Sequence, residues 1–186
     1  PCPQRGRQFG GTRAGKHIPV LGADGQIPAR AKVDAYPVEE RYGIVFAFLG
    51  DQPAAERIPL WEIAEWEQPG WRASELNIIE LDAYFERSIE NGLDPVHNEF
   101  VHALQGNMRF DPNRCSVGST DWGTKVSVRM APPKKGTTQL ENLREDDDPD
   151  NFGAWSQHHG ANTLVTRISL SKANVFVQYF FEQPVD

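Results

Sequence analysis

The chain has 186 residues, of which 39% are hydrophobic and 24% are charged, and its net charge is −7 at pH 7. This composition is typical of a soluble globular protein. The negative charge argues against nucleic acid as the main partner, because phosphate binding needs clustered Lys and Arg. No apolar run approaches the roughly 18 residues of a membrane span, so we expect no membrane association. The cysteines, Cys2 and Cys115, lie far apart in the chain, which favours a reduced, cytoplasmic setting over a disulfide framework.

The first part of the chain predicts little regular structure. Residues 1–35 are rich in Gly, Pro and Arg, a pattern typical of loops and short strands. Tyr42-Gly43 predicts a turn, and residues 44–49 are apolar and rich in β-branched and aromatic side chains, so they predict a short buried strand. A linker containing Pro and Trp follows, in which we expect a short helix at residues 62–66. Residues 71–81 alternate loosely and predict a strand.

The second part of the chain predicts one helical region followed by antiparallel strands. Residues 82–104 read as two helical pieces, because Gly92 and Pro95 interrupt the pattern. One or two strands are expected in residues 114–132, and the acidic run at 145–150 predicts a solvated loop. The clearest strands are 161–170 and 174–182, joined by a hairpin. The predicted fold class is therefore α+β, with an antiparallel sheet.

A carboxylate and two histidines gather in one short segment, at Asp94, His97 and His102. Asp94 is the expected N-cap of a helix, with Pro95 at the first helical position, where a missing N–H costs nothing. Imidazole suits iron, zinc, copper or nickel. Two histidines with one carboxylate are the ligands of oxygen-activating non-haem Fe(II) sites. The segment therefore suggests a metal site with open coordination positions.

The spacing of the histidines sets a condition on that site. In an ideal helix, His97 and His102 point about 140° apart, because each residue turns about 100°. They can share a metal only if the helix contains a π-type turn or bends between them. Asp94 and His97 are three residues apart and lie on one face. The alternative interpretation is a helix with two unrelated histidines.

The pattern Asp94-x-x-His97-x-x-x-x-His102, preceded by Glu90-Asn91, resembles the mononuclear-iron motif of Rieske-type non-haem iron oxygenases, in their oxygenase (alpha) subunit. The resemblance implies that His97 and His102 bind iron and that Asn91 belongs to the site. It places the third ligand, an Asp or Glu, further C-terminal than residue 186. It also implies that Asp94 hydrogen-bonds one iron histidine and bridges toward the Rieske centre of a neighbouring subunit. A carboxylate on the far imidazole nitrogen would fix the tautomer of the ligand.

The N-terminal residues resemble the second half of a Rieske [2Fe-2S] domain. Residues 2–9 read Cys-Pro-Gln-Arg-Gly-Arg-Gln-Phe, where the family has Cys-Pro-x-His-Gly-Trp-x-Phe. Cys2 stands at a cluster-ligand position, but Arg5 stands where the cluster histidine belongs. Arginine cannot ligate iron, because it stays protonated and offers no lone pair. We therefore expect no complete cluster from this chain alone, with His17 as a weak candidate for a substitute ligand.

The resemblance also implies how the chain is divided and what it does. Residues 1–52 would be the C-terminal remnant of an all-β Rieske domain, and residues 53–186 part of a catalytic domain with a helix-grip-like antiparallel sheet. The chain begins without Met and ends just after a predicted strand, so we expect a partial sequence. The implied activity is that of a mono- or dioxygenase, which hydroxylates or demethylates an aromatic or other apolar substrate with O2. Electrons would come from NAD(P)H through a reductase or ferredoxin, and the assembly would be a homotrimer or an alpha/beta hexamer.

Two other functions are compatible with the residues. The first is a non-catalytic helix-grip module that binds an apolar small molecule, since function does not follow from fold. The second is a zinc hydrolase that uses His97 and His102, which the lack of an HExxH pattern disfavours. A second histidine pair, His158-His159, offers little to either site, because adjacent residues of a strand face opposite sides.

Overall fold

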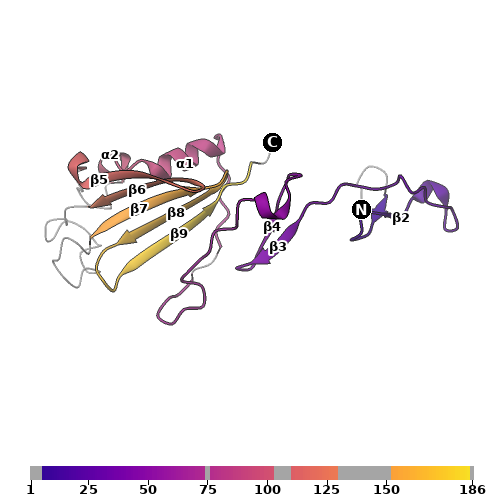
Figure 1. Cartoon of the computed structure of the whole chain (residues 1–186), viewed down its shortest axis with the longest axis horizontal. Coiled ribbons are helices and arrows are strands. Elements are labelled where there is room, and N and C mark those ends of the chain that lie inside the picture. The colour runs from indigo at the N-terminus through magenta and orange to yellow at the C-terminus, as the bar shows by residue number, and fades with distance from the viewer. Residues whose placement is uncertain (1–5, 74–75, 103–109, 130–151, 185–186) are drawn as a thin grey trace. The chain divides into compact units, whose positions relative to one another are not determined.

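The computed structural model describes residues 6–73, 76–102, 110–129 and 152–184. The chain divides into two compact units, Pro1–Arg57 and Ile58–Asp186, and it is mostly β-sheet with few helices (Figure 1). Whether these units correspond to a Rieske remnant at 1–52 and a catalytic domain at 53–186 stays a prediction. Cys2, Arg5 and the acidic run at 145–150 lie outside the described residues. In the part of the chain that is described, no helix is long and apolar enough to cross a membrane.

The first unit contains two small antiparallel hairpins, which confirms loops and short strands for the described part of residues 1–35. The hairpins pair β1 (Gln8–Phe9) with β2 (Gly15–His17), and β3 (Val38–Arg41) with β4 (Ile44–Ala47). The predicted turn at Tyr42-Gly43 joins β3 to β4, with φ of 58° and 73°. The strand expected at 44–49 is confirmed at Ile44–Ala47, but its expected burial is wrong, because Val45 is 66% exposed. A two-stranded hairpin cannot cover both of its own faces.

The second unit is built on a five-stranded antiparallel sheet in the order β5-β6-β7-β8-β9. Each strand pairs with the next one in the sequence, so residues opposite each other share a face. The predicted strands at 114–132, 161–170 and 174–182 are confirmed. The strands are β5 (Cys115–Thr120), β6 (Gly123–Arg129), β7 (Gly153–His159), β8 (Thr163–Ser169) and β9 (Val175–Phe181).

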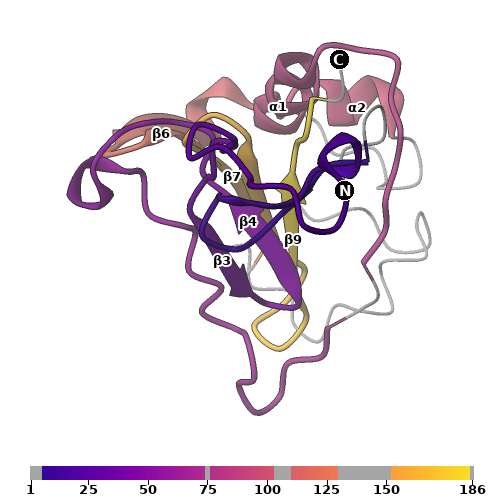
Figure 2. The ribbon, with the colours of Figure 1, turned by 90° about the vertical axis from the view of Figure 1, so that its right-hand side faces the viewer.

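Two helices lie over one face of this sheet (Figures 1 and 2). They are α1 (Phe85–Leu93) and α2 (His97–Val101), which confirms the prediction of two helical pieces. The break lies at residues 94–96, however, and Gly92 is inside α1. The expected N-cap is also wrong, because α2 begins at His97 and its N-cap is Val96. Pro95 therefore precedes the helix and does not start it.

Gly92 marks the place where α1 rests on the sheet. A Cβ atom at Gly92 would lie 2.1 Å from Cδ2 of Leu164 in β8, and Leu164 is only 2% exposed. The N-terminal half of the helix has a separate contact with the end of the sheet. The Ser88 hydroxyl donates a hydrogen bond to Glu182 Oε1 at 2.6 Å, and Glu182 directly follows β9. Glycine at position 92 therefore permits a close approach of helix and sheet, and it does not interrupt the helix.

The opposite face of the sheet is covered by residues 58–73. Glu65 accepts a hydrogen bond from Tyr179 Oη at 2.6 Å and pairs with Arg167 Nη1 at 3.3 Å. Adjacent residues of a strand point to opposite faces, and Leu164 and Val165 are 2% and 0% exposed. The sheet is thus buried on both faces at β8, which explains why the core of this unit is centred there.

The connecting segment contains neither of the elements expected in it. The helix expected at residues 62–66 is replaced by a turn at residues 64–67, where the Trp66 amide donates to the Ile63 carbonyl at 3.1 Å. So short a segment gains too few hydrogen bonds to offset helix nucleation. The described residues of 71–81, which are 71–73 and 76–81, form no strand. Ile78 and Ile79 are 86% and 74% exposed, and a strand needs a neighbour to pair with.

We predict that Gly92→Ala lowers the free energy of unfolding by about 1–2 kcal/mol. Overpacking against buried Leu164 costs about 1–3 kcal/mol, which exceeds the gain of up to about 1 kcal/mol from the better helix former. Urea unfolding measures the difference. Gly118→Ala is the matched control, because a Cβ at Gly118 meets nothing within 4 Å. Equal stabilities of the two variants would contradict the close approach.

Candidate functional site

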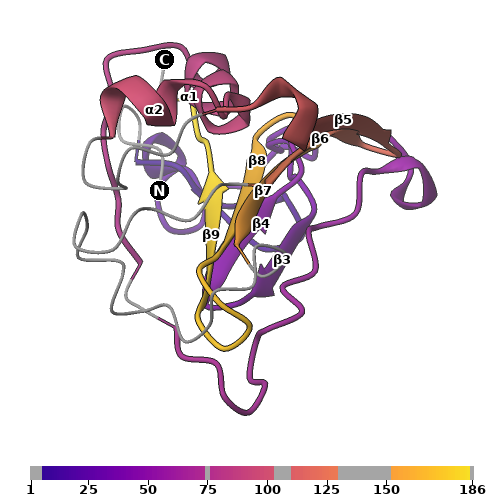
Figure 3. The same cartoon turned by 90° about the vertical axis from the view of Figure 1, so that its left-hand side faces the viewer.

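Asp94, His97 and His102 lie at the end of α1 and along α2, the two helices labelled in Figure 3. Asp94 terminates α1 with an extended backbone, at φ −86° and ψ 107°. His97 is the first residue of α2, and His102 is the residue that caps its C-terminus. The whole motif therefore sits on one short helix and the bend in front of it.

Asp94 shapes that bend with both its side chain and its main chain. Its Oδ1 accepts a hydrogen bond from the Val96 amide at 2.8 Å, an Asx turn that stabilises the tight bend. Its own amide donates to the carbonyls of Glu90 and Asn91, at 3.1 and 3.3 Å. The main chain on both sides of Asp94 is thus fixed, even though its side chain is 45% exposed.

The main-chain carbonyl of Asp94 also sets the tautomer of His97. Nδ1 of His97 lies 2.6 Å from this oxygen. A carbonyl can only accept a hydrogen bond, so Nδ1 carries the proton and, in the neutral ring, Nε2 holds the lone pair. The nearest carboxylate oxygen of Asp94 is 3.8 Å from Nδ1, too far for a hydrogen bond. The contact that the resemblance assigns to the carboxylate is therefore made by the backbone of the same residue.

The two imidazole rings lie close together without a π-turn. Their centroids are 5.1 Å apart and their planes are inclined at 73°. Because α2 ends at Val101 and His102 has φ −103° and ψ 69°, the angular separation of an ideal helix does not apply. Metal–imidazole bonds are about 2.0–2.1 Å long, and rings this close can share one ion. Two neutral imidazoles are also donors that suit iron, so the pair fits the implied metal.

The other candidate residues do not join this pair. Within the described ranges, no group of three or more His, Cys, Asp and Glu residues could hold a metal ion. Asn91 is an exposed residue of α1, and Cys2 lies outside the described residues. His159 turns to the face opposite the helices, where its Nε2 lies 2.8 Å from the Pro59 carbonyl. His158 faces the other way, in line with the expectation for adjacent histidines in a strand.

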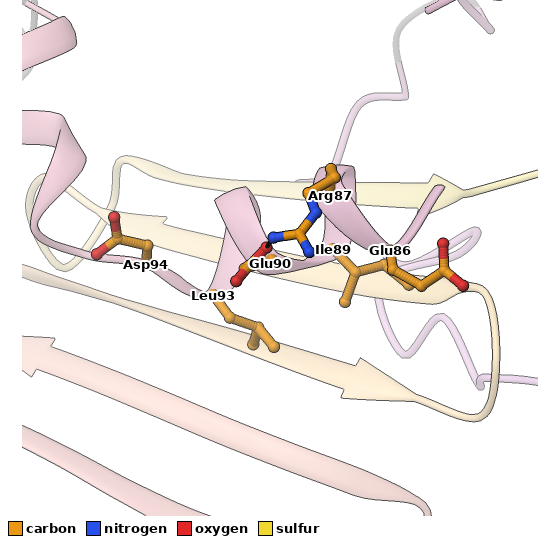
Figure 4. Close-up of a pocket in the computed structure, with 6 residues that line it drawn as sticks. All are labelled: Glu86, Arg87, Ile89, Glu90, Leu93 and Asp94. Atoms are coloured by element: carbon orange, nitrogen blue, oxygen red, sulfur yellow. Dashed lines mark hydrogen bonds and ion pairs between the residues drawn. The ribbon is translucent and has the colours of Figure 1, made fainter. Parts of the chain in front are cut away.

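A shallow hollow of about 550 Å³ runs along α1 (Figure 4). Neither histidine of the motif lines it, and Asp94 is the residue that it shares with the motif. Arg87 and Glu90 form an exposed ion pair across it. Its lining residues are Glu86, Arg87, Ile89, Glu90, Leu93 and Asp94. The hollow is open and its lining carries both positive and negative charges, so it offers few apolar contacts to a substrate.

Sequence reasoning overlooked Glu99, which lies between the two histidines. Its Oε2 accepts a hydrogen bond from the Phe110 amide at 3.0 Å. A carboxylate between the two histidines was visible in the sequence, but its partner was not, because the two residues are 11 positions apart. This contact gives α2 an attachment to the chain that follows the motif.

Known proteins with similar sequences are demethylases. The chain is 32% identical over 79 residues to the 5,5'-dehydrodivanillate O-demethylase oxygenase subunit of a Sphingobium species, and this match covers 42% of the chain and 18% of that protein. It is 34% identical over 112 residues to methylxanthine N1-demethylase NdmA of Pseudomonas putida, covering 60% and 30%. It is 27% identical over 169 residues to the vanillate O-demethylase oxygenase subunit of a Pseudomonas species, covering 80% and 47%.

These matches support the resemblance to Rieske-type oxygenases at the level of the family. The chain spans less than half the length of each of these relatives, at 18%, 30% and 47%. No protein-family model matches the chain, and no solved structure matches it. The relatives point to an oxidoreductase of the demethylase oxygenase kind, whereas the activity, substrate and partners of the whole protein are matters for proposal.

We predict that His97 is the Nδ1–H tautomer when neutral, whereas His159 is the Nε2–H tautomer. Each assignment follows from the nitrogen that lies next to a carbonyl oxygen, 2.6 Å away for His97 and 2.8 Å away for His159. Long-range ¹H–¹⁵N correlation spectra distinguish the two tautomers, and each residue serves as the control for the other. An Nε2–H tautomer at His97 would contradict the role given to the Asp94 carbonyl.

Proposed function

We propose that this chain is part of the oxygenase component of a Rieske-type demethylase, in which His97 and His102 bind a mononuclear Fe(II). The observation that carries the proposal is the pair of imidazole rings 5.1 Å apart, one of them with its Nδ1 proton held by the Asp94 carbonyl. Metal-binding histidines almost always donate their second N–H in this way. The similarity to demethylase oxygenase subunits points to the same chemistry.

The residues of the chain would prepare the site for the metal. The Asp94 carbonyl holds the proton on Nδ1 and so keeps the Nε2 lone pair of His97 directed away from the helix start. His97 is 17% exposed, so its ring is shielded from most of the solvent and its orientation is restricted. When bound, Fe(II) with open coordination positions supplies the activation of O2. The third ligand would be an Asp or Glu further along the polypeptide.

The Asp94 carboxylate would have a separate role. One of its oxygens holds the Val96 amide, and the other lies 3.8 Å from His97. With 45% of its side chain exposed, this carboxylate can also reach a group outside the chain. We therefore propose that it bridges toward the Rieske centre of a neighbouring subunit, with Asn91 nearby on α1. A bridge of this kind requires a ring-shaped assembly, such as a homotrimer or an alpha/beta hexamer.

The Rieske cluster and the electron source are part of the same proposal. Electrons from NAD(P)H would arrive through a reductase or ferredoxin and a [2Fe-2S] cluster, to which Cys2 would contribute. Arg5 stands at a histidine position and offers no lone pair. This chain alone should therefore bind mononuclear iron without acid-labile sulfide.

The proposed substrate is an apolar ring that carries a methyl group on oxygen or nitrogen. The relatives are named for divanillate, vanillate and methylxanthine. Phe180 of β9 is the cross-strand partner of Leu164 in β8, so both side chains point to the face of the sheet that carries the helices. Phe176 lies four residues earlier in β9 and points to the same face. These two rings are 49% (Phe176) and 38% (Phe180) exposed, so the face of the sheet that carries the helices offers apolar contact area for such a ring.

The alternative is a non-catalytic helix-grip module that binds an apolar molecule on the same face of the sheet. The exposed Phe rings of β9 are compatible with this alternative, but a binding module without a metal does not need a fixed tautomer at His97. The two functions differ in one measurable respect, because only the oxygenase needs a metal. Metal content therefore separates them before any substrate is known.

We predict that the full chain, freshly purified or after anaerobic addition of Fe(II), holds about one iron per chain and no acid-labile sulfide. Either His97→Ala or His102→Ala should weaken Fe(II) binding by more than about 100-fold, because even the loss of an outer hydrogen-bond partner of a ligand costs about 10–100-fold. Metal analysis and anaerobic titration measure both effects. Iron binding that both histidine substitutions leave unchanged would favour the binding module.

The control for this experiment is His159→Gln. It removes an imidazole from the opposite face of the sheet, where His159 contacts Trp61 and the Pro59 carbonyl. Glutamine can still donate to that carbonyl, so Fe(II) affinity should stay within about 3-fold of the wild-type value. Iron accompanied by sulfide would contradict the reasoning on Arg5, since a cluster would then form.

A further inference from the structure

Helix α2 carries both histidines but has little burial to hold it in place. It has five residues, and none of them is buried. Phe100 and Val101 are 76% and 67% exposed. A helix this short is not stable on its own, because nucleation is unfavourable and few hydrogen bonds follow. Its position must therefore be set by attachments to other parts of the chain.

The attachment at the start of α2 is the bend at Asp94. The Asx turn to Val96 and the contact with His97 Nδ1 both act there. This bend joins α2 to α1, which is itself fixed on the sheet through Gly92. It controls His97, the first residue of the helix, but His102 lies at the far end.

The second attachment is the contact of Glu99, the middle residue of α2, with Phe110. The Glu99 Oε2 accepts the Phe110 amide at 3.0 Å, in partly buried surroundings. A hydrogen bond to a charged acceptor is stronger than one between neutral groups. The contact joins the middle of α2 to the chain that returns after the motif.

The segment after Phe110 is held in place by its own hydrogen bonds and by its connection to the sheet. Asp111 caps a short 3₁₀ helix (Pro112–Arg114) by accepting from the Asn113 amide at 2.9 Å. That helix leads directly into β5, the edge strand of the five-stranded sheet. The sheet therefore holds α2 through two connections, one through α1 at the start of the helix and one through β5, Phe110 and Glu99 at its middle.

We propose that Glu99 is a positioning residue that sets the separation of the His97 and His102 rings. The inference rests on the proposed metal site, because a fixed separation matters when both rings bind one ion. Glu99 lies two residues after His97 and three before His102, so a shift of its carboxylate moves the backbone that carries both. Among the contacts of the described residues, the Phe110 contact is the one that holds α2 beyond its start, so its loss should release His102 from its fixed place.

The first test uses the metal-free full chain, so it does not depend on the metal. Ring protons of His97 and His102 should show a mutual nuclear Overhauser effect in the wild type and in Glu99→Gln, whose amide oxygen still accepts the Phe110 amide. Glu99→Ala should lose this signal, while Glu86→Ala on α1 is the matched control and should keep it. Circular dichroism confirms folding of each variant. A signal that persists unchanged in folded Glu99→Ala would overturn the proposal.

The second test measures Co(II), a spectroscopic substitute for Fe(II). Glu99→Ala should weaken Co(II) binding by about 10–100-fold and change its visible absorption spectrum, as expected when an outer contact orients a ligand. Glu99→Gln should stay within about 3-fold of the wild type. A purely structural role would lower the unfolding temperature without changing the spectrum, and that result would count against the proposal.

The two tests separate the failure of this inference from the failure of the proposed function. Co(II) binding that His97→Ala and His102→Ala leave unchanged would refute the metal site, and the ring-proton signal would then decide the role of Glu99 by itself. Should Glu99→Ala not fold, Glu99→Asp replaces it, because its shorter carboxylate cannot reach the Phe110 amide in the same helix position. Loss of the ring-proton signal in folded Glu99→Asp supports the proposal, and its retention overturns it.

Discussion

The close contact between α1 and the sheet at Gly92 and Leu164 is the constraint on which the candidate site depends. Leu164 belongs to β8, where both faces of the sheet are buried, so it offers a fixed surface. The helix approaches so closely that a Cβ at Gly92 would overlap the Leu164 side chain. Because Gly92 is in the last turn of α1, this contact also fixes where the chain leaves the helix. The position of His97 is therefore set by packing five residues earlier in the sequence.

The bend between the helices then determines the orientation and the tautomer of the His97 imidazole. Pro95 has no amide proton and disfavours a helical conformation at Asp94, so the helix cannot continue through the motif. Asp94 then uses its side chain for the Val96 amide and its carbonyl for His97 Nδ1. One residue thus stops the first helix, stabilises the turn and selects the histidine tautomer.

Local pattern was enough to predict the strands at 114–132, 161–170 and 174–182 and the division of the helical region, because alternation and interruption are local signals. It failed where the outcome depends on distant partners. The run at 44–49 is apolar yet exposed at Val45, since its hairpin contains one other strand. Strand β7, whose Ser and Gln residues give weak alternation, becomes a strand because β6 and β8 pair with it on both sides. Gly92 looked like a helix breaker because Leu164 is invisible from the sequence around it.

In the candidate site, too, the sequence spacing was informative, but the path of the backbone between the histidines was not predictable from it. The i, i+5 spacing requires a π-type turn or a bend between the histidines, and the structure has the second of these, because α2 ends before His102 and the backbone leaves the helical path. This solution leaves the helix exposed, with no buried residue to hold it. Burial would fix α2 more firmly, but it would also cover the side of the histidines on which a metal needs open coordination positions. Hydrogen bonds of Asp94 and Glu99 hold the helix at its start and at its middle without such burial, which is compatible with the proposed metal site.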